Sequence, residues 1–248
     1  MVILKTRDEL RLMQKAGAIT AAALHAGGAA VKPGVTTRQI DRIIHNYIVE
    51  NGAKPSFFGY GGFPASACIS VNDEVIHGIP GERTLCEGDI VSIDVGAQIG
   101  GYHGDSAYTF ACGKISSEAQ ALLDGTQKSL ENAIAQAHVG NRIGDIAFAV
   151  QNTVEPMGYS VVREFVGHGI GKNLHEAPEV PNYGAAGRGI RLAAGMVIAI
   201  EPMINAGAWG VKVLENNWTV VTRDHSISAH FEHTVAITED GPLVLTRL

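Results

Sequence analysis

The feature that most constrains the fold of this chain is a repeat of one helical pattern in its two halves. Apolar residues at positions i, i+3, i+4, i+7 and i+8 mark one face of a helix. This pattern occurs twice between flanking glycines, and each matched pair of residues is 106 positions apart. The pairs are Gly34 with Gly140, Ile40 with Ile146, Ile43 with Ala149, Ile44 with Val150, Tyr47 with Thr153, Ile48 with Val154, and Gly52 with Gly158. Any two amphipathic helices align on a few residues, but the shared glycine spacing favours a true repeat.

Each of these helices is preceded by a second one and followed by strand-like runs. A capping-box pattern at Thr6 begins a helix running towards Ala30, and a similar pattern at Ser117 begins one running to about His138. Two helix pairs, each followed by strands, predict an α+β protein with pseudo-twofold symmetry. No low-complexity segment or linker separates the halves, so we expect one catalytic domain over residues 1–248, with halves of about 1–112 and 113–248.

Two aspartates lie in the stretch 90–110, which is rich in Val, Ile, Tyr and Phe. If this stretch folds as a hairpin turning at about Ile99 and Gly100, Asp94 and Asp105 face each other. Directly opposed residues have Cβ atoms about 5 Å apart. Two carboxylates at that distance repel each other unless a proton or a cation lies between them. Taken alone, the pair is also compatible with the solvated face of an ordinary hairpin.

Further ligand-type residues downstream favour a metal site. Glu201 interrupts the apolar run VIAIEPMI, and Glu232 lies between Phe231 and another apolar run. A buried carboxylate is costly unless it is paired or bound to metal. His168, in a glycine-flanked turn, offers a nitrogen ligand. Four carboxylates and one imidazole suit two divalent cations such as Mn, Fe(II) or Co. The alternative is a buried ion pair at each residue, but few basic residues lie in these strands.

The composition excludes several other classes of protein. The chain has 46% hydrophobic residues and a net charge of −6, which argues against nucleic acid as its main partner. Three scattered cysteines fit a reducing compartment. The N-terminus becomes charged within five residues, unlike a signal peptide, and the strongest apolar run is too short to span a bilayer. We therefore expect a cytoplasmic protein with no membrane partner.

These motifs resemble those of type I methionine aminopeptidases of the pita-bread fold, and the resemblance extends from about Thr6 to the C-terminus. Five residues match, in order, the metal ligands of that family: Asp94 and Asp105 in IDVGAQIGGYHGD, His168 in GHGIG, Glu201 in IEPM, and Glu232 in FEHT. The spacing of the later ligands leaves no room for the helical insertion of type II relatives. No zinc-finger extension precedes them, as in bacterial-type members.

Other residues match positions that contact substrate in the family. His77 in VIHGIP and His175 in NLHEAP match its two active-site histidines that are not ligands. The pocket for the methionine side chain would be lined by Tyr60, Phe63, Cys68 and Trp218. Two residues depart from the usual pattern. Leu174 stands where the family usually has an aromatic residue, and Phe57 stands where bacterial relatives often have a smaller one; both changes affect the shape of the substrate pocket.

The resemblance implies a function as well as a site. The chain would remove methionine from the N-termini of nascent polypeptides whose second residue is small, using two divalent ions (Mn, Co or Fe(II)). The ribosome is a candidate partner, and nucleic acid is not required. Glu201 would accept a proton from the attacking water, His175 would stabilise the oxyanion, and His77 would contact the scissile amide nitrogen, although the two histidines could exchange roles.

Two other functions remain open from the sequence alone. One is cleavage of Xaa-Pro bonds, as in aminopeptidase P and prolidase, but those relatives usually carry an additional N-terminal domain. The other is a non-catalytic relative that binds peptides, nucleic acid or a protein partner, but such relatives typically lose metal ligands. A further open point concerns His230, which shares the strand face of Glu232 and could support the ligands.

Overall fold

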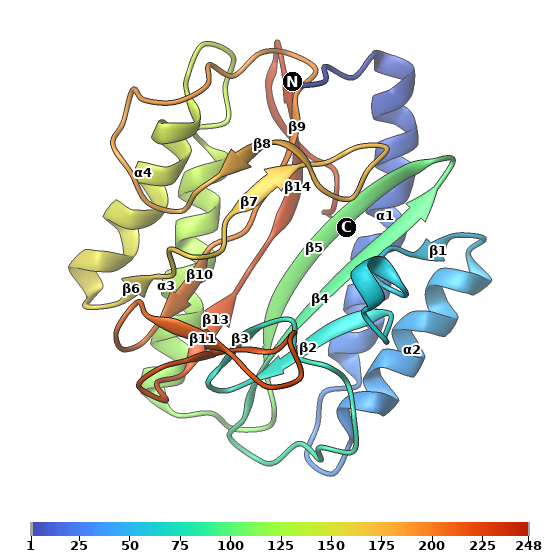
Figure 1. Cartoon of the computed structure of the whole chain (residues 1–248), viewed down its shortest axis with the longest axis vertical. Helices are drawn as coiled ribbons and strands as arrows, with labels where there is room; N and C mark the ends of the chain where they lie inside the picture. The colour runs from blue at the N-terminus through green and yellow to red at the C-terminus, as the bar shows by residue number, and fades with distance from the viewer. Residues whose placement is uncertain (1, 248) are drawn as a thin grey trace.

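The computed structural model describes residues 2–247 and contains two helix pairs beside antiparallel sheets (Figure 1). The first pair is α1 (Arg7–Ala29) and α2 (Thr37–Glu50), and the second is α3 (Ser117–Ile134) and α4 (Ile143–Val154). Two short 3-10 turns are η1 (Tyr60–Gly62) and η2 (Glu155–Met157). The predicted α+β class with a repeated helix pair is confirmed. Among the described residues, no helix combines the length and the apolar character needed to cross a bilayer.

The helix ends follow the capping patterns of the sequence, with one correction. Thr6 and Thr36 cap α1 and α2, and each hydroxyl accepts a hydrogen bond from the backbone N–H three residues later. The predicted start of α3 at a Ser117 cap is wrong by one residue. Ser116 has the extended backbone of an N-cap and accepts from the N–H of Ala119. The helix also ends at Ile134, before the predicted His138, because the chain turns there.

Short strands pair in four antiparallel sheets. One sheet has the order β1-β4-β2, with β5 paired to β4, and another has the order β15-β14-β9-β7-β8. Two three-stranded sheets have the orders β13-β10-β6 and β11-β12-β3. The strands are β1 (Lys54–Pro55), β2 (Ala67–Val71), β3 (Glu74–Ile76), β4 (Ile90–Ile99), β5 (Tyr102–Ala111), β6 (Ser160–Val161), β7 (Gly167–Gly169), β8 (Glu176–Val180), β9 (Val197–Ile200), β10 (Met203–Asn205), β11 (Val211–Val213), β12 (Val220–Thr222), β13 (Ser228–His230), β14 (His233–Thr238) and β15 (Gly241–Val244).

The β4–β5 hairpin has a different register from the predicted one. Gly100 and Gly101 form its two-residue turn, with φ of 61° and 82°. Positive φ at both central residues is the requirement of a type I′ turn, which only residues such as glycine meet easily. Asp94 consequently lies opposite Ala107 and not opposite Asp105, whose partner is Gly96. The two aspartates still share one face, but as diagonal neighbours, which are about 7–8 Å apart between Cα atoms.

The two halves are built around separate cores that meet at the β5–β14 junction. α1 and α2 pack against β2 and β4, whereas α3 and α4 pack against β9 and β14. At the junction, the N–H of Glu232 donates to the carbonyl of Ala107 at 2.9 Å, and the N–H of Ala107 donates back at 3.4 Å. The hydroxyl of Thr234 also donates to the carbonyl of Asp105 at 2.7 Å. These bonds hold acidic residues of both halves side by side.

Candidate active site

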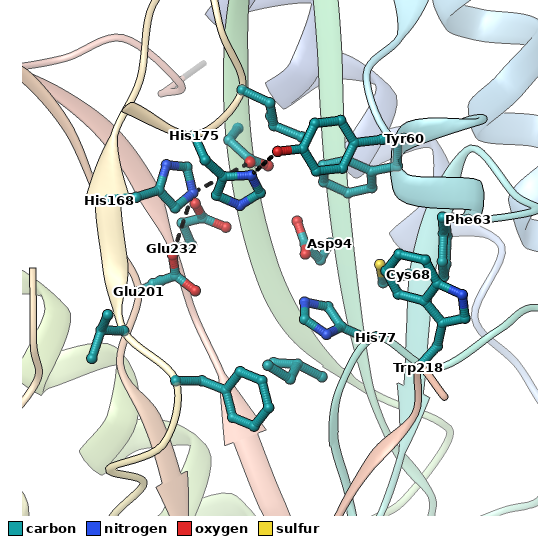
Figure 2. A pocket seen from close by; sticks show the side chains of 16 residues that line it. Tyr60, Phe63, Cys68, His77, Asp94, His168, His175, Glu201, Trp218 and Glu232 are labelled. Carbon is teal, nitrogen blue, oxygen red and sulfur yellow. Dashed lines mark hydrogen bonds and ion pairs between the residues drawn. The ribbon is translucent and has the colours of Figure 1, made fainter. Parts of the chain in front are cut away.

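Three of the five predicted ligands come from breaks or short pieces in the second-half sheets. Glu201 follows the end of β9 and precedes Pro202, which cannot donate to a ladder. Glu232 lies in the gap between β13 and β14, and His168 is the central residue of β7. These three side chains line the same pocket as Asp94 and Asp105, and Figure 2 shows them on the side of the pocket facing Asp94.

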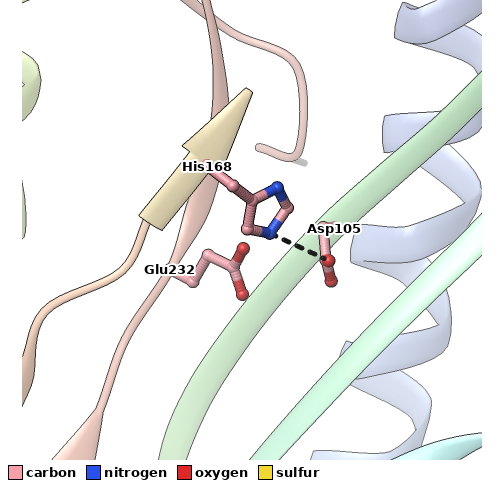
Figure 3. A group of neighbouring side chains, drawn as sticks. All are labelled: Asp105, His168 and Glu232. Atoms are coloured by element: carbon pink, nitrogen blue, oxygen red, sulfur yellow. Dashed lines mark ion pairs between the residues drawn. The ribbon is translucent and has the colours of Figure 1, made fainter. Parts of the chain in front are cut away.

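The five side chains converge on one pocket. We call Asp94, Asp105, His168, Glu201 and Glu232 the ligand cluster; all five line this pocket. Ligand atoms of Asp105, His168 and Glu232 lie within 4.8 Å of one another (Figure 3). Nε2 of His168 is 3.9 Å from Oδ2 of Asp105 and 3.5 Å from Oε1 of Glu201. The predicted ligands are therefore assembled, with Asp94 and Glu201 beside the tightest group of three.

Burial shifts the protonation of the whole ligand cluster. It raises the pKa of Asp94 to about 7. The pKa values of Asp105, Glu201 and Glu232 are raised well above their ordinary values, first by burial and then by the charge of neighbouring carboxylates. Burial lowers the pKa of His168 to about 3. Four carboxylates can thus be ionised together here only if cations balance them.

The donor atoms of the ligand cluster fit divalent metal. Oδ1 of Asp94, Oδ1 of Asp105 and Oε1 of Glu232 are buried and have no hydrogen-bond partner. Such atoms are expensive to bury unless something binds them. Nδ1 of His168 lies 2.9 Å from the carbonyl of Gly169, which makes it the N–H donor and leaves the Nε2 lone pair facing the carboxylates. A fixed tautomer of this kind is typical of histidine ligands.

The two predicted non-ligand histidines line the same pocket, and in Figure 2 His175 lies above Asp94 and His77 below it. The ring of His175 packs against that of His168, with centroids 4.2 Å apart and planes tilted by 57°, and its Nδ1 is 2.7 Å from the hydroxyl of Tyr60. His77 has a left-handed backbone with φ of 58°, an uncommon conformation for a non-glycine residue. Burial lowers the pKa of both rings, that of His77 to about 4, so both are neutral at pH 7.

An apolar compartment adjoins the ligand cluster. We call Phe57, Tyr60, Phe63, Cys68 and Trp218 the aromatic pocket; these residues line the same cavity. Phe63 and Trp218 meet edge to face at 5.1 Å. Cys68 in β2 is the direct strand partner of Asp94 in β4, so the compartment and the ligand cluster share a sheet. Burial raises the pKa of the Cys68 thiol, which keeps it protonated and apolar.

The departures at Phe57 and Leu174 have a structural explanation in part. Phe57 packs over Gly96, where an added Cβ would lie 2.7 Å from the ring. The bulky ring is thus accommodated by a glycine of the strand opposite Asp105. Leu174 is buried and lines the pocket beside His175.

Some pocket residues were missed by the sequence analysis. Phe165 and Val166 line the cavity from the irregular segment before β7, and Ile76 lines it from the end of β3. In the sequence, the indication that Phe165 lines the pocket was its position three residues before His168. His230, left open above, is buried with Nε2 3.7 Å from Oε2 of Glu201. This nitrogen is buried and has no hydrogen-bond partner, so it faces the ligand cluster without bonding to it.

Comparison with known proteins agrees with this site. The model of metallopeptidase family M24 matches residues 11–239, and the chain therefore belongs to that family. Relatives that match over the full length of this chain are named methionine aminopeptidases. The chain is 53% identical over 247 residues to the methionine aminopeptidase of Clostridium acetobutylicum, covering 99% of both chains. It is 51% identical over 248 residues to methionine aminopeptidase 1 of Bacillus subtilis, covering 100% of both.

A solved structure extends the comparison to the fold. The crystal structure of a methionine aminopeptidase from Thermotoga maritima matches with a TM-score of 0.98 and 44% identity, covering 100% of both chains. The resemblance drawn from the motifs is confirmed by these matches, and so is the pita-bread fold.

Proposed function

We propose that this chain removes N-terminal methionine from peptides and nascent proteins by metal-assisted hydrolysis. The observation that carries the proposal is the direct pairing of Cys68 with Asp94, which places an apolar, sulfur- and ring-lined compartment beside a carboxylate cluster. The apolar compartment fits an unbranched thioether side chain, and the carboxylate cluster fits cations that activate water. The full-length relatives named methionine aminopeptidases support the same activity and do not favour the Xaa-Pro or non-catalytic alternatives.

The ligand cluster would hold two divalent ions, for which Mn, Co and Fe(II) are the best candidates. Oxygen-rich ligation with one imidazole suits these metals better than a thiolate-type zinc site does. When bound, such a metal pair lowers the pKa of water towards neutrality and polarises a carbonyl oxygen. The three buried carboxylate oxygens without hydrogen-bond partners support this assignment.

The remaining roles belong to side chains around the ligand cluster. Glu201 would accept the proton of the attacking water, and the buried Nε2 of His230 lies 3.7 Å from its carboxylate. The Tyr60 hydroxyl would donate to Nδ1 of His175, so that the proton on Nε2 faces the developing oxyanion. His77 would contact the amide nitrogen of the scissile bond.

The aromatic pocket would bind the methionine side chain. Phe57, Phe63 and Cys68 are almost fully buried, so they form a preformed wall, whereas Tyr60 is 46% exposed at the mouth. Sulfur–aromatic contacts favour methionine over a hydrocarbon of the same length. By the family resemblance, the residue after the methionine would be small.

The cellular setting is also part of the proposal. Nascent polypeptides would be the substrates, the ribosome is a candidate docking partner, and the cytoplasm is the expected compartment. We also propose that residues 1–248 form one catalytic domain with halves of about 1–112 and 113–248, because backbone bonds between Ala107 and Glu232 join them.

A panel of tripeptides tests the activity. Purified protein is first stripped by prolonged chelation, then loaded with Mn, Co or Fe(II), and given peptides that begin with Met-Ala, Met-Lys, Leu-Ala and Ala-Pro. We expect rapid release of methionine from the first peptide only, and none from the stripped protein. Preferred cleavage of Ala-Pro would assign the chain to the Xaa-Pro class, and cleavage of no peptide by any loaded form would favour a binding protein.

A further inference from the structure

A buried ion pair connects the segment before α1 to the loop that carries His175. Nζ of Lys5 lies 2.5 Å from Oε2 of Glu176, and the two side chains are only 3% and 5% exposed. Each of the other Lys or Arg ion pairs within residues 2–247 has a partner that is at least 43% exposed. Exposed pairs contribute little to stability, whereas loss of one partner of a buried pair leaves an uncompensated charge. The Lys5–Glu176 pair therefore contributes to the structure in a way that the exposed ion pairs do not.

The loop between β7 and β8 folds around the carboxylate of Glu176. Its Oε1 accepts a hydrogen bond from the N–H of Asn173 at 3.2 Å. Gly171 packs so closely that an added Cβ would lie 2.5 Å from Cε of Lys5 and 2.7 Å from Oε1 of Glu176. The N–H of Gly171 donates to the carbonyl of Asn173 at 3.1 Å. One carboxylate, neutralised by Lys5, thus organises the turn that leads to His175.

Lys5 is itself fixed to the strand that leads to Glu201. Its backbone N–H donates to the carbonyl of Gly195 at 2.7 Å, in the turn just before β9. In Figure 1 the segment between β7 and β8 reaches towards the tip of the β4–β5 hairpin, and the N–H of His103 there donates to the carbonyl of Gly171. The ion pair therefore sets the position of the loop relative to the strands that carry the ligand cluster.

We infer that Lys5 is a positioning residue for His175 and acts through Glu176. The inference rests on the proposed role of His175, which immediately precedes Glu176 in the chain. Lys5 is not among the residues that line the site pocket. Without its charge, the buried Glu176 carboxylate would turn towards water and carry the adjacent His175 with it. A displacement of about 1 Å in a catalytic group lowers the rate by about 100-fold.

The first test is Lys5→Met, which keeps the length of the stem and removes the charge. In Mn-loaded protein with a Met-Ala tripeptide, we expect kcat to fall by about 10- to 100-fold. KM and the Mn affinity measured by calorimetry should stay within about twofold of the wild-type values, because the substrate pocket and the ligands are unchanged. A wild-type kcat, or loss of Mn binding, would overturn the inference.

Two further backgrounds separate positioning from general damage. In His175→Ala protein, Lys5→Met should change kcat by less than about twofold, since residues acting as a unit are not additive. If Lys5→Met lowered kcat in His175→Ala protein by the same factor as in wild type, Lys5 would act by another route. If Lys5→Met does not fold, Glu176→Gln replaces it as the test, because it breaks the ion pair from the other side and keeps an acceptor for Asn173, while the Lys5 ammonium is left without its carboxylate partner. The same losses are expected, and wild-type kcat in Glu176→Gln overturns the inference.

A measurement independent of activity completes the design. Hydrogen exchange of the 171–176 amides should be faster in Lys5→Met than in wild type. The matched control is Lys172→Met, which removes a 70% exposed lysine from the same loop and should leave exchange and kcat unchanged. If wild type cleaves no peptide, the proposed function fails, yet the exchange experiment still reports on the loop. Unchanged exchange in Lys5→Met overturns the inference alone.

Discussion

The ligand cluster and the aromatic pocket lie side by side in one cavity but are built differently. The ligand cluster takes its side chains from both halves and is fixed by strand pairing and by the Ala107–Glu232 backbone bonds. The aromatic pocket depends on the irregular segment 56–63, in which three glycines have positive φ. Rigid pairing suits groups that must share small cations, whereas an irregular loop allows a side-chain pocket to vary. Changes in the first should therefore affect every substrate, and changes in the second only discrimination.

The largest effect is expected from Glu232→Ala. It removes a buried carboxylate that we propose as a metal ligand, so metal affinity should fall by more than the roughly 10- to 100-fold that loss of a supporting partner costs. Turnover of every peptide should be abolished at ordinary metal concentrations. Calorimetric titration with Mn and a peptide assay measure the two effects. Glu239→Ala, at an exposed position after β14, is the control. Full activity in thoroughly metal-free wild type would contradict the two-metal proposal.

A smaller effect is expected from His175→Ala, which should distinguish a histidine that acts in catalysis from one that binds metal. The variant should keep its metal and lose about 10²- to 10³-fold in kcat if the ring stabilises the oxyanion. His168→Ala should instead lose metal affinity, because its Nε2 faces the carboxylates. Metal content and kcat of the two variants are compared directly. A His175 variant that binds no metal, or that turns over normally, would show that the roles are wrongly assigned.

Changes in the aromatic pocket should be smaller again and selective. Trp218→Leu should lower kcat/KM for Met-Ala peptides by about 10- to 200-fold, the range expected for lost contacts in an apolar pocket. Its metal affinity should stay unchanged. Trp209→Leu, at a 45% exposed position, is the matched control. A peptide beginning with norleucine tests the sulfur contact in wild type, and equal loss of all substrates in Trp218→Leu would remove the distinction between the two regions.

The smallest effect is a pH dependence confined to the ligand cluster. Asp94 has a pKa of about 7 in the metal-free fold, against 3.8 ordinarily, so its protonated form stabilises the fold below about pH 4. That contribution is lost as pH rises through 7, and metal binding must displace the proton. The proton on Asp94 alone should make metal affinity rise by up to about tenfold per pH unit between pH 5 and 7, and the raised pKa values of the other three carboxylates should add to this slope. His168, with a pKa of about 3, is neutral between pH 5 and 7, so metal binding releases no proton from it. Titration in buffers of different ionisation enthalpy measures the released protons, and none at pH 6 would contradict the expectation.

The sequence predicted the helices, and the grouping of five ligand-type side chains in one cavity, more accurately than the hairpin geometry. Thr6 and Thr36 begin their helices as the capping boxes indicated, because a cap is a local interaction. The apolar surroundings of Glu201 pointed to a buried carboxylate, and its side chain is only 13% exposed. The hairpin register was wrong by one residue in the turn, although the Gly100–Gly101 pair itself carried the signal for a type I′ turn.

Other features depended on contacts that no local pattern encodes. Phe165 reaches the cavity from an irregular segment, so neither strand nor helix periodicity marks it. Lys5 and Glu176 are 171 positions apart, and each alone resembles an ordinary surface charge. The bond between Tyr60 and His175 joins two loops whose approach is set by the whole fold.

The two-glycine turn between β4 and β5 limits how the length of this chain can vary. Side chains alternate between the faces of a strand, so one residue inserted at Gly100 would move every following side chain of β5 to the opposite face. Asp105 would then point towards the helices, while Asp94 stayed in place. Insertions in a surface loop such as 184–189 would leave the cavity unchanged. The length of this hairpin therefore determines the face on which Asp105 lies, whereas the length of the exposed loop 184–189 does not.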